Sequence, residues 1–289
     1  MDSSGISDIS FNIISDFSPE KSSKSEHYDL NADLVLVASN PGQSTRIESS
    51  SRASYMQATT SADCLATLTL RDLSPLAIES MVLGLIMWEV KGVVIVAGDP
   101  PLEVPCKGLT QDWPKRTTQQ IRSLQKLIQD HKNPANPFVL GSVVDLGQSI
   151  DKAADLAGLK VKSGAEFFIT QPIFSEGPAF DFETLLMERL GGMEKPSIYY
   201  GLQLLEQGSL CFSIVPDRVK EEVERETNNL DSLTALAKKL IASGHKQFYT
   251  IPPIFSGGQR NYQLCRDFNL LLKKLIMAPK GQERTDSHL

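Results

Sequence analysis

Eight short apolar runs, each followed by a segment with helical periodicity, are the feature that most restricts how this chain folds. The runs are 5–7 residues long, rich in β-branched and aromatic residues and bounded by turn residues, at 9–14, 33–38, 65–70, 92–97, 138–144, 166–170, 197–201 and 246–252. Nearly unbroken apolar strands are typical of a parallel sheet covered on its outer face, so the pattern predicts a (β/α)8 barrel. A doubly wound open sheet is the alternative, but the GxGxxG fingerprint that usually follows its first strand is absent.

The segments between the runs carry helix signals. Ser74 and Pro75 supply an N-cap and a first-turn proline, and apolar stripes recur at 121–128, 233–241 and 261–277. We therefore expect one barrel domain at 9–277. The polar ends at 1–8 and 278–289 are expected to be mobile.

Composition excludes several classes of protein. The chain has 289 residues, 41% of them hydrophobic, and a formal net charge of −6, which argues against a broad nucleic-acid or anionic-membrane surface. No apolar run is long enough to span a membrane, and the acidic, serine-rich N-terminus is unlike a secretory signal, so we expect a cytoplasmic protein. The 4 cysteines and 4 histidines are too scattered to predict a metal site or a disulfide framework.

Polar side chains follow the predicted strands. In a barrel of this class the reactive groups lie at the carboxyl ends of the strands. The candidates, in strand order, are Asp16, Asn40, Arg71 with Asp72, Gly98 with Asp99, Asp145, Thr170 with Gln171, and Gln203, and the eighth strand is followed by PPIFSGGQR.

Some of these candidates have an equally simple structural explanation. Asp72 comes two residues before a helix N-cap, where a turn or capping role is at least as natural as chemistry. Asp99 precedes two prolines, which force an extended turn. Asp145 and Gln203 are also explained as ordinary polar residues of loops.

Gln171 and the SGGQR segment point to ligands. Gln171 lies between apolar residues, and its amide offers both a donor and an acceptor, which suits the edge of a heterocycle. The glycine pair at 256–260 with Arg260 suits a phosphate, although two adjacent glycines equally form a flexible turn.

The order and spacing of six segments resemble the methylenetetrahydrofolate reductase family, a family of flavin-bearing (β/α)8 barrels. The resemblance covers roughly residues 9–255 and is closest to the form fused with homocysteine methyltransferases. Its most specific segment is KVKSGAEFFITQPIF. The others are DFSPEK, SNPGQSTR, TLTLRD, VAGDPP and GLQLL.

The resemblance implies a role for several residues. Asp16 stands where the family has the glutamate that protonates N10 of the folate, so that the methylene bridge opens. Asp99 matches an aspartate near flavin and pterin, Gln171 a glutamine that binds the pterin and also accommodates nicotinamide, and Lys160 a lysine near the FAD phosphates. Without the resemblance, the sequence pattern predicts that Lys160 lies on the surface of a helix. The same resemblance places Phe174 and Gln203 with the folate, and Asn40, Thr67, Ala97 and Gly98 with the cofactor.

The chain departs from the family pattern at several positions. Aspartate at position 16 is one methylene shorter than glutamate, so its acid lies about 1.5 Å farther back, and a displacement of that size can cost roughly 100-fold in rate. Glu20 replaces a proline of the motif. Thr67 and Ala97 stand where some members have histidine and arginine, and Asp145 replaces a more usual polar or Asn-Pro element.

Three functions remain open from the sequence. The leading one is FAD-dependent reduction of 5,10-methylenetetrahydrofolate to 5-methyltetrahydrofolate, with electrons from NAD(P)H or a protein donor. The second is a catalytically altered folate- or flavin-binding relative that works as a homo-oligomer or beside a methyltransferase or redox partner. The third is a phosphate-ester barrel enzyme that uses the SGGQR segment.

Overall fold

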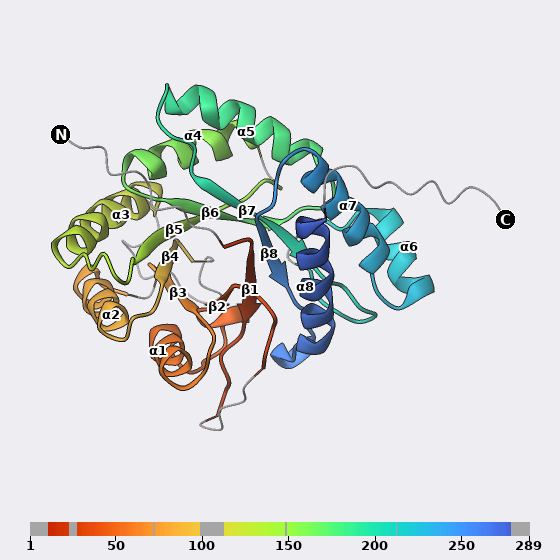
Figure 1. Cartoon of the computed structure of the whole chain (residues 1–289), viewed down its shortest axis with the longest axis horizontal. Helices are drawn as coiled ribbons and strands as arrows, with labels where there is room; N and C mark the ends of the chain where they lie inside the picture. Colours follow the sequence, from red (N-terminus) through yellow and green to blue (C-terminus); the bar gives the residue numbers. More distant parts are fainter. Residues whose placement is uncertain are drawn as a thin grey trace, which may run out of the picture.

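A closed barrel of eight parallel strands surrounded by helices is the architecture of this chain (Figure 1). The computed structural model describes residues 11–22, 28–71, 73–98, 113–147, 149–211 and 213–278. The terminal segments predicted to be mobile lie outside these ranges except for Ala278, so their mobility stays a prediction.

The strands follow one another around the barrel in sequence order. They are β1 (Ile13–Phe17), β2 (Leu34–Val37), β3 (Cys64–Thr69), β4 (Gly92–Val96), β5 (Val139–Val144), β6 (Phe167–Pro172), β7 (Ser197–Gln203) and β8 (Phe248–Ile251). The pairing of Ile14 with Tyr249 joins β1 to β8 and closes the sheet. The predicted barrel is therefore confirmed, and the open-sheet alternative is wrong.

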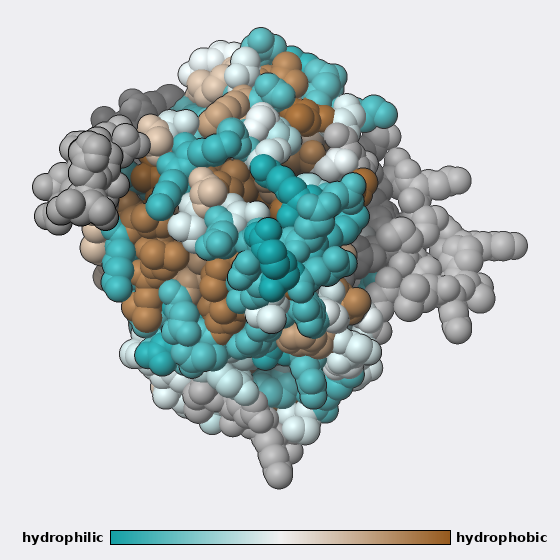
Figure 2. All heavy atoms as spheres, turned by 90° about the vertical axis from the view of Figure 1, so that its right-hand side faces the viewer, coloured by the Kyte–Doolittle hydropathy of each residue, from teal (hydrophilic) through white to brown (hydrophobic). Residues whose placement is uncertain are grey.

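Helices separate the strands and form the outer ring. They are α1 (Ser49–Thr59), α2 (Pro75–Met87), α3 (Trp113–Asp130), α4 (Ile150–Lys162), α5 (Gly177–Leu190), α6 (Asp217–Glu226), α7 (Leu230–Ala242) and α8 (Tyr262–Met277), with short 3-10 turns η1 (Pro41–Gln43) and η2 (Ser256–Gly258). Ser74 caps α2 by accepting a hydrogen bond from the backbone N–H of Ala77, as its sequence signal predicts. Figure 2 shows the face that carries α6–α8, where hydrophilic side chains cover much of the surface and hydrophobic ones gather mainly in its left half.

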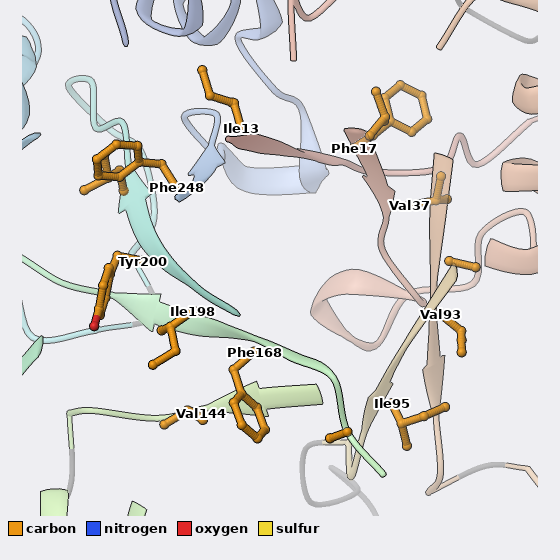
Figure 3. Close-up of a cluster of buried hydrophobic side chains, with 14 of the residues drawn as sticks. Ile13, Phe17, Val37, Val93, Ile95, Val144, Phe168, Ile198, Tyr200 and Phe248 are labelled. Carbon is orange, nitrogen blue, oxygen red and sulfur yellow. The ribbon is translucent and has the colours of Figure 1, made fainter. Parts of the chain in front are cut away.

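Alternation along each strand divides the apolar residues into two cores. One set packs between the strands and the helices, and Figure 3 shows members such as Phe17, Ile95 and Phe248 pointing away from the barrel axis. The other set fills the barrel interior and includes Ile14 and Tyr249. Since neighbouring side chains of a strand point to opposite faces, any polar residue in register with the inner set faces the interior.

Backbone pairing corrects three predicted boundaries, since β7 runs past its expected end at 201 and includes Gln203. The first strand was expected at 9–14 with Asp16 after it, and the sixth at 166–170 with Gln171 after it. Instead, Asp16 lies within β1 and Gln171 lies within β6. The strands continue because their backbones still pair, Asp16 with Leu36 of β2 for example, although the apolar pattern has already ended.

Candidate active site

A cavity of about 530 Å³ opens at the carboxyl ends of the strands. Its lining residues come from β1 to β6 and β8 and from the loops that follow these strands, while β7 supplies none. Apolar side chains such as Leu36, Val143 and Ile169 line it together with polar groups. Its volume lies in the range of small-molecule and cofactor sites.

Ten of the candidates named from the sequence line this cavity: Asp16, Asn40, Thr67, Arg71, Ala97, Gly98, Asp145, Thr170, Gln171 and Arg260. Asp99, predicted to be catalytic, lies outside the described residues. Lys160, Phe174 and Gln203 do not line the cavity. The shared location follows from the barrel, while the roles of these residues stay predictions.

Asp16 is a buried acid at the edge of the cavity. Its Oδ1 accepts a hydrogen bond of 2.8 Å from the hydroxyl of Tyr249, and Oδ2 lies 3.8 Å from Nε of Arg260. Burial raises the pKa of Asp16, and the charge of Arg260 and the Tyr249 hydrogen bond only partly offset this effect. A carboxyl with a raised pKa is more easily protonated than a free one, which is the direction that a proton donor needs.

Arg260 reaches this acid from the loop after β8. Its side chain is only 4% exposed, and its Nε has no hydrogen-bond partner. Arg46 lies nearby, and burial together with the charge of Arg260 lowers the pKa of Arg46. A Cβ atom on Gly258 would lie 1.9 Å from Nη2 of Arg46, so this glycine leaves room for the guanidinium. Gly258 thus has a packing role beside the phosphate role predicted for the glycine pair.

Gln171 and Gly98 shape the opening. Gln171 is exposed at the end of β6, so its amide is open to a ligand. Gly98 has φ of +91°, and a Cβ there would lie 2.5 Å from Cγ2 of Thr69. Only glycine fits this position after β4 without displacing its neighbours.

Lys160 is buried, so its interpretation as a helix-surface lysine is wrong. It is 5% exposed, and its Nζ donates a hydrogen bond of 2.7 Å to the carbonyl of Val143. It lines a side cavity of about 190 Å³ that shares Val143 and Asp145 with the main cavity. The exposed Lys152 lines the same side cavity and was missed from the sequence, because a helix-surface lysine carries no signal of its own.

Replacing Lys160 with methionine is expected to stabilise the ligand-free protein. Burial lowers the pKa of Lys160 from 10.5 to about 8, so between those values the unfolded chain binds a proton that the folded chain does not. Lys160 therefore makes the free energy of unfolding rise with pH across that window. Lys160→Met should remove this rise and increase the free energy of unfolding near pH 7 by as much as about 3 kcal/mol. Urea unfolding near pH 7 and pH 10 measures both effects. Lys152→Met, at an exposed position, should change stability by less than about 0.5 kcal/mol, and a less stable Lys160→Met protein near pH 7 would contradict the argument.

Gln203 and Phe174 lie apart from the cavity. Gln203 is fully buried, its Nε2 donates to the carbonyl of Leu210, and its Oε1 accepts from the thiol of Cys211. Both ends of its amide are thus bonded within the protein. The carbonyl of Phe174 accepts a hydrogen bond from Arg218. Neither residue lines the main cavity, and their binding to folate stays a prediction.

Tyr249 was missed by the sequence reasoning and Arg260 was assigned to another ligand. Tyr249 lies inside the predicted eighth strand, and its inward register with Ile251 is the signal that would have pointed to the interior. Among the described residues, no group of three His, Cys, Asp or Glu side chains is placed to hold a metal ion. No helix in the described part of the chain has the length and apolar character needed to cross a membrane.

Fold and site together define a (β/α)8-barrel protein with a small-molecule cavity at the mouth of the barrel. Neither a protein-family model nor a curated protein sequence matches the chain. Among solved structures, a protein from Clostridium thermocellum described as binding two copies of 5-methyl-5,6,7,8-tetrahydrofolic acid is similar with a TM-score of 0.57 at 12% identity, over 90% of this chain and 95% of that one.

Two other solved structures are similar with TM-scores below 0.5 and carry no further argument. A 2,3-dimethylmalate lyase of the PEP mutase/isocitrate lyase superfamily has a TM-score of 0.47 at 13% identity, over 85% of this chain and 76% of that one. An oxaloacetate acetylhydrolase has a TM-score of 0.48 at 13% identity, over 92% and 81%. At these identities the likeness shows the fold alone.

Proposed function

We propose that this chain binds a reduced folate in the mouth cavity and, with a flavin bound beside it, reduces 5,10-methylenetetrahydrofolate to 5-methyltetrahydrofolate. The observation that carries the proposal is the presence of a buried carboxyl and an exposed amide, those of Asp16 and Gln171, in the lining of one cavity. The sequence resemblance assigns acid and pterin roles to these same two positions. The folate bound by the Clostridium thermocellum protein of similar fold agrees with this ligand class.

The residues present fit a flavin. The apolar lining of Leu36, Val96 and Val143 suits a flat ring, and the backbone at Gly98 allows a close approach. Lys152 and Lys160 in the side cavity supply positive charge for a pyrophosphate. A bound flavin, once reduced by a hydride from NAD(P)H or by electrons from a partner protein, would supply the hydride to the folate.

The chain's own residues do the rest of the work. The amide of Gln171 would orient the pterin edge by donating and accepting hydrogen bonds. Asp16 would hold a proton and deliver it to N10 of the folate, and Tyr249 would keep the carboxyl in one orientation through its hydrogen bond. The buried position of Asp16 keeps bulk water from competing for that proton.

A second candidate function is folate binding without efficient reduction. Thr67 and Ala97 line the cavity but bring neither the imidazole nor the guanidinium found in some family members. The side chain of Asp16 is also shorter than the glutamate of the family, which likewise favours inefficient reduction. In this case the chain would serve as a folate- or flavin-binding subunit of a methyl-transfer or redox complex.

Ligand binding by the purified protein tests the proposal. We expect a yellow protein with a flavin absorbance band, and calorimetric binding of 5-methyltetrahydrofolate that weakens about tenfold or more in Gln171→Leu, because the pterin loses its hydrogen bonds. Gln263→Leu, an exposed glutamine on α8, is the matched control and should bind like wild type. A flavin-bearing protein that binds folate but does not reduce it selects the second candidate. Colourless protein that takes up neither FAD nor folate overturns both.

A further inference from the structure

The guanidinium of Arg260 is buried without an acceptor for its N–H groups. Its side chain is only 4% exposed, and it lines the mouth cavity from the loop after β8. No hydrogen bond joins this guanidinium to another described residue, although it offers several N–H donors. Burying a charged donor in this way is costly for the fold. A ligand that supplies acceptors in the cavity would offset that cost.

The nearest carboxyl does not supply these acceptors. Oδ2 of Asp16 lies 3.8 Å from Nε of Arg260, beyond hydrogen-bond distance, and Oδ1 accepts the hydrogen bond from Tyr249. Glu20 forms its ion pair with an arginine of α1, and Glu48 caps α1 by accepting hydrogen bonds from two backbone N–H groups. The positive charge of Arg260 therefore has no directly bonded anion among the described residues.

A second guanidinium lies beside the first. Nη2 of Arg46 packs against Gly258, two residues before Arg260, and Nε of Arg46 is buried without a partner. Burial and then the charge of Arg260 lower the pKa of Arg46, so the two cations repel each other. The side-chain oxygen of Asn40, a cavity residue, accepts a hydrogen bond of 3.1 Å from the backbone N–H of Arg46. An anion between the two guanidiniums would turn this repulsion into attraction.

We propose that Arg46 and Arg260 form a phosphate-binding subsite at the β8 edge of the mouth cavity. Two guanidiniums carry two positive charges, which a phosphate dianion balances and a single carboxylate does not. The planar fork of arginine also matches two phosphate oxygens at once. The subsite requires neither folate nor flavin, so its test is separate from that of the proposed function.

This subsite is distinct from the lysine pair of the side cavity. Lys152 and Lys160 lie beside β5, whereas Arg260 approaches Asp16 on β1, and these two strands are on opposite sides of the closed barrel. A pyrophosphate held by the lysines thus leaves the arginines open. The cavity of about 530 Å³ also has room for an organic group joined to the phosphate. A free phosphate ion and the phosphate of a larger ligand share the chemistry that the arginines recognise.

Isothermal titration calorimetry with inorganic phosphate at about pH 8, where phosphate is mostly a dianion, tests the subsite. Arg260→Gln and Arg46→Gln should each weaken binding by about tenfold or more, because each removes charge-assisted hydrogen bonds. Arg260→Lys keeps the charge but not the fork, so its affinity should lie between those of wild type and Arg260→Gln. Arg225→Gln, at an arginine of α6 that is 75% exposed, is the matched control and should bind like wild type.

Two outcomes overturn the proposal. One is a wild-type protein that binds no phosphate, and the other is an Arg260→Gln protein that binds it like wild type. Thermal unfolding supplies a second measurement, in which phosphate should raise the Tm of wild type but not that of Arg260→Gln. Because Arg46 is only half-buried, Arg46→Gln repeats the test at a position where folding is less sensitive to the change.

Phenyl phosphate and succinate identify the source and the class of the anion. Phenyl phosphate that binds more tightly than inorganic phosphate assigns the subsite to a phosphate ester whose organic part lies in the cavity, and equal affinity assigns it to the free ion. In both cases Arg260→Gln should weaken the binding. Succinate, whose two carboxylates lie apart, should bind about tenfold more weakly than phosphate. Succinate that binds as tightly as phosphate overturns the phosphate assignment.

Discussion

Asp16→Asn is expected to lower the rate of 5,10-methylenetetrahydrofolate reduction by about 10²–10⁴-fold while leaving folate binding nearly unchanged. The amide keeps the size of the side chain and can still accept the hydrogen bond from Tyr249, but it has no proton to give. A positioned general acid contributes a rate factor of this order. Single-turnover reduction with flavin-loaded protein measures the rate, and calorimetry measures the binding.

The pH profile separates a proton donor from a merely structural acid. Asp16 must be protonated to act, so the wild-type rate should fall as pH rises through its pKa, which burial holds above the ordinary value. Asp16→Asn should lose this dependence. Tyr249→Phe removes a hydrogen bond that lowers the pKa of Asp16, so the falling limb should move to higher pH.

Folding controls keep the result interpretable. Because the folded-state pKa of Asp16 is raised, the free energy of unfolding falls as pH rises from the ordinary carboxyl pKa through the raised one, so Asp16→Asn should unfold no more easily than wild type at neutral pH. Asp16→Glu restores the family's longer acid, and a large gain in rate would favour the altered-relative function. An Asp16→Asn protein with the wild-type rate would remove Asp16 from the chemistry.

The barrel and the location of the site could be predicted from the sequence because both depend on local patterns. Eight apolar runs fix the strand order, and in a parallel barrel the carboxyl ends of the strands must meet at one mouth. Asn40 and Gln171 are more than 100 residues apart in the sequence, yet strand-end position alone brings both to the cavity.

Contacts between distant loops could not be predicted in this way. The approach of Arg260 to Asp16 depends on how the chain after β8 turns back over β1, and no local signal encodes that path. The burial of Lys160 depends on how α4 packs on β5. The position of Gln203 near the end of a strand predicted a site residue. However, the loop after β7 folds back, and the amide of Gln203 donates a hydrogen bond to the carbonyl of Leu210.

Glu20, which stands where the motif of methylenetetrahydrofolate reductases has a proline, has a structural role in this chain. Its carboxylate accepts two hydrogen bonds of 2.8 Å from Nε and Nη2 of Arg52 on α1. Arg52 is 2% exposed, and its guanidinium lies 5.1 Å from the ring centre of Phe17. The pair joins the loop after β1 to α1 close to the mouth of the barrel.

Glu20→Ala is therefore expected to destabilise the protein by about 3–5 kcal/mol, because it leaves the buried guanidinium of Arg52 without its carboxylate. In a chain of this size that corresponds to a fall in Tm of roughly 6–20 °C. Glu20→Pro, which restores the family's residue, should destabilise by a similar amount. Thermal and urea unfolding measure both.

The control and the double variant decide whether the ion pair is the cause. Asp155→Ala breaks an exposed pair with Arg189, also at 2.8 Å, and should cost no more than about 1 kcal/mol. Glu20→Leu/Arg52→Met removes both charges, so it should recover much of the stability that Glu20→Ala loses, since an apolar pair can replace a buried ion pair at little cost. Glu20→Leu and Arg52→Met are also measured singly. If the double variant loses as much stability as the sum of these two losses, Glu20 and Arg52 act independently, and their ion pair is not what holds the loop to α1.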